Sequence, residues 1–319
     1  MLLSPPPAAP GRLLAIATDF PLEWSAVAGL MLIDAVWAQR VGFSVSVSSL
    51  DGRALLMALA AAILFRAMLQ QNRGSLSAEF LAVSIAAATA FGVLSYLCCT
   101  VAQPLVDERL LRLDRALGFD WLFWFHLIVA HPVVETVLRL AYDSLVYQGL
   151  YAAILFGLLG RRDRLRELFW VIFISGILTS AGSVFFPALG AYDAFGLRSL
   201  SDYIPDMERL RAGADLHFEL GKLTGIVTFP SFHTTMALVY CYGFRRTEAI
   251  GRVIFALNMA MLPAIPFYGG HYFVDMVGGA AVAVLSIMAV RSLSALGHRR
   301  ADGAQTAAPF VPLGDPGSP

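Results

Sequence analysis

Long apolar runs alternate with short polar segments along the chain, and the runs are long enough to enter a membrane. A transmembrane helix needs about 20 predominantly apolar residues, and eight runs approach that length. Asp34 and Arg40 interrupt the first of them. The candidate spans are residues 24–45, 54–69, 80–104, 144–160, 168–186, 230–244, 250–267 and 271–290. This pattern predicts an all-α protein, a polytopic bundle of about eight transmembrane helices.

Two longer segments between these runs predict structure at the membrane surface. Residues 105–142 interleave charged residues with leucines and include two tryptophans, a pattern typical of an amphipathic helix and an aromatic belt at the interface. Residues 187–228 predict a long polar loop, and loops of this length usually act as lids or binding segments. The organisation expected along the chain is a tail at 1–20, N-terminal transmembrane helices at 21–104, a second membrane domain at 105–291 and a disordered tail at 292–319.

Arginine clusters predict the orientation of the later spans. They lie between the fourth and fifth spans, between the sixth and seventh, and after the eighth. If the spans alternate in direction, all three clusters lie on one side, and arginine-rich short loops are typically cytoplasmic. His233 and His271 then lie near the outer face. The short loops and the preference for arginine over lysine favour a bacterial inner membrane.

Composition agrees with a membrane protein. Of the 319 residues, 58% are hydrophobic and only 14% are charged, whereas a soluble domain usually carries about 25% charged residues. The formal net charge is zero, so the chain lacks the basic footprint of a nucleic-acid-binding protein. The partner expected from composition is the lipid bilayer.

Two short polar signatures stand out in these apolar surroundings. Residues 229–235 read Phe-Pro-Ser-Phe-His-Thr-Thr, and residues 269–275 read Gly-Gly-His-Tyr-Phe-Val-Asp. Each places a histidine, His233 or His271, where an apolar run begins. An ionisable group inside a membrane is a functional-site hypothesis by default. Two of them at equivalent helix starts predict one shared site.

The residues of these signatures suit acid–base and nucleophilic chemistry. His271 and Asp275 are four apart, so on a helix they share one face, and the carboxylate would fix the imidazole tautomer. An oriented neutral imidazole is a competent nucleophile, and phosphorus is an electrophile that it can attack without a metal or cofactor. His233 would serve as general acid and base. Helix N-termini after the breakers Pro230 and Gly269-Gly270 would favour phosphate, with a hydroxyl donor from Ser231.

Each of these residues also has a plainer structural interpretation. A single histidine at an interface is often an anchor, and Ser231 is equally well explained as an ordinary N-cap. Tyr142 lies at a helix start on the outer side, where it fits an interfacial polar residue better than a pocket residue. Lys222 fits a loop charge that faces lipid headgroups. The combination of two histidines and Asp275 nevertheless favours catalysis.

The two signatures resemble motifs of the type 2 phosphatidic acid phosphatase superfamily. Pro230-Ser231-Phe232-His233 is similar to its second motif, and His271 with Asp275 is similar to the end of its third. The full residue sequence of the two signatures more closely resembles the branch that contains inositol phosphorylceramide synthase, an inositolphosphotransferase. The resemblance covers about residues 117–290. It implies a helical bundle, a catalytic domain within 105–291, no cofactor or metal, a phosphohistidine intermediate, and a lipid phosphate or phosphodiester substrate. It also implies that His271 is the nucleophile, Asp275 its orienting acid and His233 the general acid.

The chain departs from this family where phosphate-binding cations are usual. The arginine expected six residues before the histidine is Ile265, preceded by Ala264 in place of serine. If Pro187 is the proline of the first motif, Phe186 replaces its arginine and Thr179 its lysine. Phosphoryl transfer depends on charge stabilisation, so another cation is needed. The candidate substrate-binding residues are Lys222, then Arg139, then Arg198, together with Ser231 and Gly270.

The resulting hypothesis is a metal-independent lipid phosphatase or phosphotransferase that acts at the outer membrane face. Water or an alcohol would meet the phosphohistidine, and the sequence does not choose between them. Two other classes remain open. One is a catalytically inactive lipid-binding relative, which the absent arginines favour. The other is a transporter that uses the His–Asp pair as a proton relay, although no ladder of ionisable residues reaches the middle of the membrane.

Overall fold

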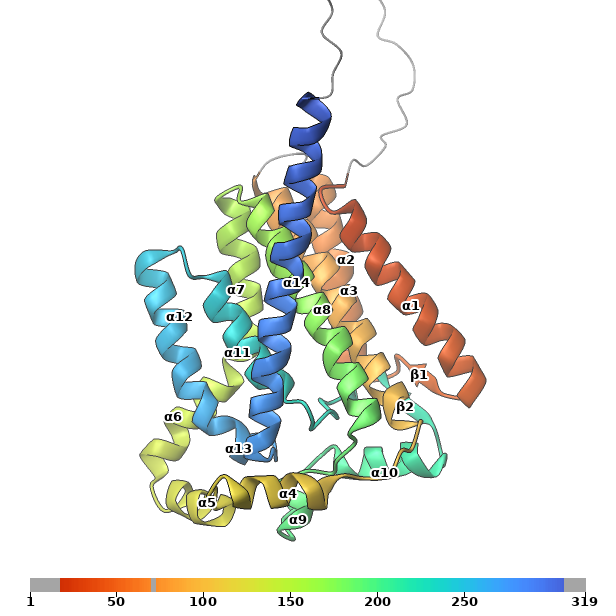
Figure 1. The fold of residues 1–319 in the computed structure, drawn as a ribbon. Coiled ribbons are helices and arrows are strands. Elements are labelled where there is room, and N and C mark those ends of the chain that lie inside the picture. The colour runs from red at the N-terminus through yellow and green to blue at the C-terminus, as the bar shows by residue number, and fades with distance from the viewer. Residues whose placement is uncertain (1–17, 70–72, 307–319) are drawn as a thin grey trace, which may run out of the picture. The chain divides into compact units, whose positions relative to one another are not determined.

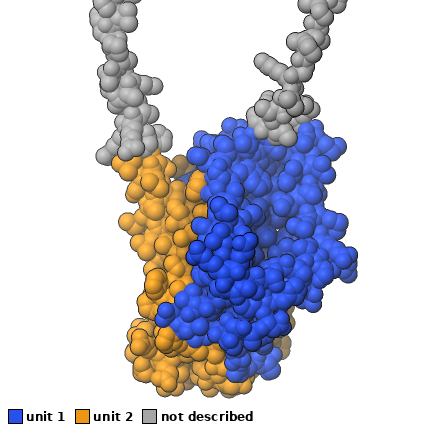
Figure 2. Space-filling view, turned by 90° about the vertical axis from the view of Figure 1, so that its right-hand side faces the viewer, with its two compact units in different colours: residues 1–103, 143–169, 198–226 blue, residues 104–142, 170–197, 227–319 orange. Residues whose placement is uncertain are grey.

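The computed structural model describes residues 18–69 and 73–306, and side chains as far as Leu296. The chain packs as two compact units, which Figure 2 shows in different colours. Unit 1 comprises residues 1–103, 143–169 and 198–226, as far as they are described, and unit 2 comprises 104–142, 170–197 and 227–319. Two segments of the domain expected at 105–291, residues 143–169 and 198–226, pack with the N-terminal helices in unit 1, and the expected domain boundaries stay a prediction.

Unit 1 is built around α3 (Arg73–Cys99), the longest helix of this unit. It packs against α1 (Pro21–Val41), α2 (Leu50–Leu69) and α7 (Leu145–Leu158). Small residues allow one of these contacts to be very close: a Cβ at Gly157 would lie 2.0 Å from Ser77 Oγ. Such close approach of helix backbones is a common way to associate helices in lipid, where no hydrophobic driving force exists.

The polar end of unit 1 has more regular structure than the loop predicted at 187–228. It contains β2 (His217–Glu219), which pairs in parallel with β1 (Ser44–Ser46), with Ser44 opposite His217. Phe43, Tyr96 and Phe218 pack together beside this pair, with ring centroids 5.0–6.5 Å apart. The same segment also contains η1 (Arg198–Leu200), α10 (Ile204–Ala212) and η2 (Leu220–Lys222).

Unit 2 brings the two signatures together at the start of neighbouring helices. α11 (Phe232–Gly243) packs on α14 (Phe273–Thr306) and on α12 (Glu248–Met261), which leads through η3 (Leu262–Ala264) into α13 (Ile265–Tyr268). α4 (Asp107–Ala116) crosses the first turn of α14 (Figure 1). The remaining helices are α5 (Trp121–Val129), α6 (Pro132–Asp143) and α9 (Ala191–Ala194), and α8 (Arg162–Phe185) begins in unit 1 and ends in unit 2.

The all-α membrane bundle predicted from the sequence is confirmed, but a count of eight spans is not. Among the described residues, six helices are long and apolar enough to cross a membrane: α1, α2, α3, α8, the run from Glu248 to Tyr268, and α14. A seventh span exists only if α5 and α6, bent by 108°, are counted as one. The predicted spans at 144–160 and 230–244 are the shorter helices α7 and α11, of 14 and 12 residues.

The structure agrees with the predicted interfacial helix but differs from the predicted C-terminal tail. α4 is amphipathic, with Leu110 and Asp114 buried among exposed neighbours, as the pattern at 105–142 predicted. α14 continues to Thr306, so the tail predicted from 292 is helical over its first part. Residues 1–17 and 307–319 lie outside the described residues.

Candidate active site

His271 and Asp275 contact each other as their spacing predicted. His271 Nδ1 lies 3.3 Å from Asp275 Oδ2, and both side chains are buried, at 3% and 0% exposure. One detail differs from the expectation. His271 does not lie on the helix, because α14 begins two residues later at Phe273. The pair therefore joins the residue that leads into the helix to an acid in its first turn.

Asp275 also caps the helix on which it lies. The backbone N–H of Tyr272 donates to Asp275 Oδ2 over 2.9 Å. An acid in the first turn that accepts from the N-cap backbone is half of a capping box. One carboxylate thus holds both the imidazole and the peptide that follows it, so the position of His271 is tied to the start of α14.

A second acid, Asp114 of α4, covers the same helix end. Its two carboxylate oxygens each accept a 2.8 Å hydrogen bond, from the backbone N–H groups of Phe273 and Val274. A phosphate at the first turn of α14, expected from the sequence, is therefore not supported. The first N–H groups of this helix already have carboxylate partners, and a further anion there would face Asp114 and Asp275.

Asp107, also on α4, binds the segment at Leu189 and Gly190 and the side chain of Tyr272. It accepts from the backbone N–H groups of Leu189 and Gly190, at 3.0 and 2.8 Å, and from the hydroxyl of Tyr272 at 3.0 Å. Asp107 and Asp114 are seven residues apart, about two helical turns, so they project from one face of α4. This face holds the segment around His271 at two points.

The second signature is attached to the first by direct hydrogen bonds. The backbone N–H of Ser231 donates to the carbonyl of Asp275 over 3.0 Å, and Thr235 Oγ1 donates to the carbonyl of Gly279 over 2.9 Å. Gly279 permits this approach, since a Cβ there would lie 2.3 Å from the carbonyl oxygen of Ser231. The Ser231 hydroxyl accepts from the N–H of Thr234 at 3.4 Å, so it acts as the N-cap of α11.

His233 lies in the first turn of α11, with its imidazole stacked on Tyr142. The two ring centroids are 4.2 Å apart and the planes differ by 11°. The Tyr142 hydroxyl lies 3.4 Å from His233 Nδ1. His233 is also close enough to His271 for the two imidazoles to interact electrostatically. The two histidines therefore lie near each other, and their membership of one catalytic site stays a prediction.

Burial keeps His271 uncharged. His271 lies between the membrane-spanning segments that end at Tyr268 and begin at Phe273. Burial lowers its pKa from 6.5 to about 4, and a backbone hydrogen bond to Thr228 opposes this shift. Trp121 Nε1 donates to the carbonyl of His271 over 3.1 Å. A neutral imidazole with its backbone held in this way is suited to act as a nucleophile near neutral pH.

The three candidate cations are each ion-paired, and only Arg139 belongs to the same unit as the histidines. Its guanidinium pairs with Glu135 at 2.6 Å and lies 6.0 Å from the centre of the Tyr268 ring. Lys222 pairs with Glu219 at 3.3 Å and Arg198 pairs with Glu208, all within unit 1.

The remaining predicted residue, Gly270, has a structural role. It adopts a positive φ of 64°, a conformation that favours glycine, and its carbonyl accepts from the N–H of Ala191 over 2.7 Å. Ile265 and Ala264, which stand where the family motif carries arginine and serine, are fully buried. Among the described residues, no group of three histidine, cysteine, aspartate or glutamate side chains is placed to hold a metal ion.

The sequence did not identify Asp107, Asp114 and Trp121 as supports of the site. For Tyr142 it favoured an interfacial role over a role in the pocket. A signal for the two acids was present. They lie seven apart on an amphipathic helix, and Asp114 falls on its leucine face, where a charge needs a buried partner. No comparable signal marks Tyr142, because its partner is 91 residues away.

Comparison with known proteins agrees with this geometry. A model of the PAP2 superfamily matches residues 108–289, which include α4 except its first residue, both signatures and the first half of α14. No curated protein and no solved structure matches the chain. The superfamily comprises phosphoesterases, and the matched segment covers more than half of the chain. On these grounds the protein is an integral membrane member of the PAP2 superfamily.

Proposed function

We propose that the protein is a lipid phosphatase or phosphotransferase, similar to inositolphosphotransferases, that works through a phosphohistidine at the outer membrane face. One observation carries the proposal: the His271–Asp275 pair is attached to the start of the helix that carries His233. A nucleophile, its orienting acid and a second titratable group are the parts that two-step phosphoryl transfer requires.

The chemistry follows from the tautomer that Asp275 selects. With Nδ1–H on the carboxylate, Nε2 of His271 carries the lone pair and attacks phosphorus. The bond from phosphorus to the leaving oxygen breaks as His233, protonated at this stage, gives its proton to that oxygen. Water or an alcohol then loses a proton to His233 and attacks the phosphohistidine, which returns His271 to its neutral form.

A cation is needed to balance the charge of the phosphoryl group. We propose Arg139 for this role ahead of Lys222 and Arg198. Arg139 lies beside Tyr268, whose ring is 5.9 Å from Tyr142, and Tyr142 stacks on His233. This series of contacts connects the guanidinium to the proposed general acid and supports Arg139 over the other two cations.

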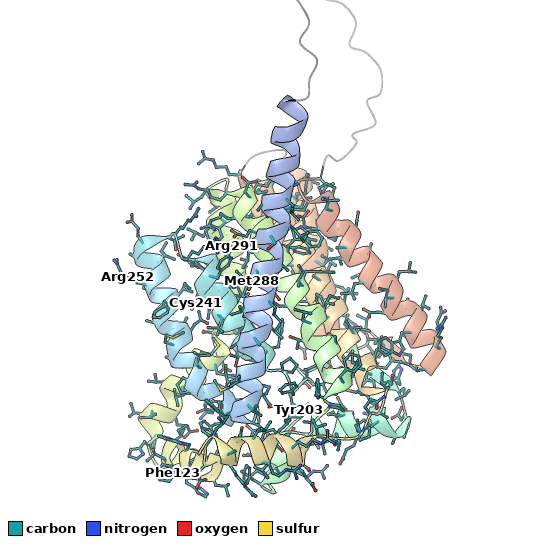
Figure 3. The ribbon with its side chains drawn as sticks, in the orientation of Figure 1. Phe123, Tyr203, Cys241, Arg252, Met288 and Arg291 are labelled. Carbon is teal, nitrogen blue, oxygen red and sulfur yellow. The ribbon has the colours of Figure 1, made fainter. Side chains whose placement is uncertain are left out.

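The outer membrane face is proposed from the distribution of arginines in unit 2. Figure 3 shows Arg252 near the upper end of α12 and Arg291 about halfway along α14, at a similar level, whereas Phe123 of α5 lies at the lower end. His271 precedes the first residue of α14, at that lower end (Figure 1). Because arginine-rich ends are typically cytoplasmic, the lower end is the extracytoplasmic one. We propose the bacterial inner membrane on the same basis.

The test is turnover of lipid phosphates and phosphoinositides by the purified full chain, with and without an alcohol acceptor and with a chelator present. We expect phosphate release or transfer that survives the chelator and falls to background in His271→Ala. His233→Ala should also lose most turnover, because the leaving oxygen then lacks its acid and the incoming water or alcohol lacks its base. Release without transfer identifies a phosphatase, and transfer identifies a phosphotransferase.

Three outcomes contradict the proposal. Turnover that persists in His271→Ala removes the nucleophile from the mechanism. Lipid binding without turnover in the wild type identifies an inactive lipid-binding relative. Proton-coupled transport in proteoliposomes, without lipid turnover, identifies the His–Asp pair as a relay.

A further inference from the structure

A carboxylate that the proposed reaction does not use lies buried in unit 1. Asp34 is in the middle part of α1, a candidate membrane span, and is 5% exposed. Neither of its carboxylate oxygens has a hydrogen-bond partner among the described residues. Its neighbour Ile33 is 57% exposed, so α1 turns an apolar side outward and this acid inward.

Asp34 differs in this respect from Glu79, another buried acid of the same unit. Glu79 accepts from Thr18 and from the backbone N–H of Asp19, and pairs with Arg66 at 2.6 Å. These contacts give Glu79 a structural role that joins three segments. Asp34 joins nothing, so its burial has no comparable structural explanation.

The side chain of Asp34 faces a cavity of about 310 Å³ between α1, α3 and the segment around β1. This volume is at the lower end of small-molecule sites, which run from about 300 to 1,000 Å³. Thr89 is the one other polar residue of the wall, and its hydroxyl donates to the carbonyl of Ile85 over 2.9 Å. The rest of the wall is apolar and includes Met31, Ala38, Phe43, Val45 and Val93.

The chemistry of this cavity selects its ligand. A buried charge without a partner is among the most costly features a protein can hold, and an ionisable residue in a membrane helix marks a functional site by default. A metal ion does not suit the cavity, because hard cations require about six oxygen ligands and one carboxylate with apolar walls cannot supply them. An ammonium group attached to an alkyl chain satisfies both the acid and the walls.

We propose that this cavity binds the protonated amine of a membrane amphiphile, with its ammonium group on Asp34 and its chain against Met31, Phe43 and Val93. The acid supplies a charge-assisted hydrogen bond, and the apolar walls cover the first part of the chain. The amine group of a lipid headgroup and that of a single-chain alkylamine share this chemistry. The site shares no residue with the proposed catalytic pair His271 and Asp275, and its ligand is not consumed.

The test compares two photoreactive probes of equal chain length, a primary alkylamine and the matching alcohol, on the purified full chain. We expect saturable labelling of α1 and α3 by the amine, at least tenfold stronger than by the alcohol. Asp34→Asn keeps the shape and removes the charge, so amine labelling should fall to the level of the alcohol. Glu23→Gln is the matched control, because Glu23 is also a buried acid of α1 and lies 3.8 Å from Arg166. It should keep amine labelling.

A second measurement keeps the test valid if labelling is inefficient. Ligands that bind the folded state raise its apparent stability, so the amine should raise the melting temperature of wild type but not of Asp34→Asn. Without ligand, Asp34→Asn should melt at or above the wild-type temperature, because it relieves a buried charge. Melting temperatures in nanodiscs of phosphatidylethanolamine and of phosphatidylcholine distinguish the two possible sources of the amine, a lipid headgroup and a single-chain alkylamine. Stabilisation by the former alone identifies a lipid headgroup, and stabilisation by the alkylamine alone identifies a single-chain ligand.

His271→Ala separates this inference from the proposed function. It should abolish turnover and leave amine labelling unchanged, whereas Asp34→Asn should do the reverse. Equal labelling by amine and alcohol overturns the inference, as does amine labelling that is unaffected by Asp34→Asn. Loss of labelling in His271→Ala also overturns it, because the probe would then occupy the substrate site.

Discussion

The ring of Tyr142 lies nearly parallel to the imidazole of His233, with centroids 4.2 Å apart. The hydroxyl of Tyr142 is 3.4 Å from His233 Nδ1, longer than the usual 2.5–3.0 Å for a strong hydroxyl hydrogen bond. Stacking is therefore the main interaction between them. It sets the plane of the ring that we propose transfers the proton.

The first prediction separates these two interactions. Tyr142→Phe keeps the stack and removes the hydroxyl, so turnover should change by less than about threefold. Tyr142→Ala removes the stack and frees the imidazole to rotate, and we expect a loss of up to about tenfold, since aromatic pairs contribute roughly 0.5–1.5 kcal/mol beyond burial. Initial rates on a lipid phosphate measure both. Equal losses in the two variants would assign the effect to the hydroxyl instead.

The second prediction uses the space around His271. A Cβ at Gly269 would lie 2.5 Å from His271 Cδ2 and 2.9 Å from Nε2, although the backbone φ of −99° is permitted for alanine. Gly269→Ala should therefore displace the imidazole without straining the backbone, with a turnover loss of about 100-fold, the scale expected for misplacement of a catalytic group.

Gly92→Ala is the control for this change, because a Cβ there meets nothing within 4 Å. It should keep wild-type turnover. Both proteins should elute as wild type in size exclusion and keep the same helical circular dichroism. A fully active Gly269→Ala would show that His271 tolerates displacement, which a nucleophile does not.

The third prediction concerns Asp114, which accepts from two backbone N–H groups at the start of α14. Asp114→Ala removes both bonds and should lower the free energy of unfolding by about 1–2 kcal/mol, as loss of a helix cap does. Because the same turn holds Asp275, kcat should fall as well. Asp114→Asn should lose less stability and less kcat than Asp114→Ala, since its amide oxygen still accepts one hydrogen bond.

Glu108→Ala provides the comparison on the same helix. Its side chain is 92% exposed and lies 3.7 Å from Arg112, so its loss should change neither stability nor kcat. Denaturant unfolding and kcat at saturating substrate measure the two effects. An Asp114→Ala enzyme with reduced stability and normal kcat would confine Asp114 to a structural role.

The fourth prediction follows from the lowered pKa of His271. Between about pH 4, its folded value, and its ordinary value of 6.5, the unfolded chain binds a proton that the folded protein does not. The free energy of unfolding should therefore increase as pH rises through this window and stay level above it. His271→Asn should flatten part of that slope, which melting temperatures in buffers from pH 4 to 8 would show. An unchanged slope in the variant would assign the acid sensitivity to other groups.

The local features of this protein were determined by the sequence alone. Hydropathy predicted the helical membrane bundle, and the spacing of His271 and Asp275 predicted their contact, because both depend on residues near one another in the chain. The two motifs also placed the chain in its superfamily, as the match over 108–289 confirms. Helix count was the weaker prediction, because an apolar run does not reveal that the helices α7 and α11 have only 14 and 12 residues.

Only the tertiary structure decided which partners the buried polar groups have. The bonds of Asp114 to the first turn of α14 link residues about 160 positions apart, and the cavity at Asp34 exists only because α3 packs against α1. Hydropathy reports that a segment leaves water, but it does not report which distant N–H or carboxylate it meets there. That choice belongs to packing, since each buried polar group must find its partner among the segments that the fold brings alongside it.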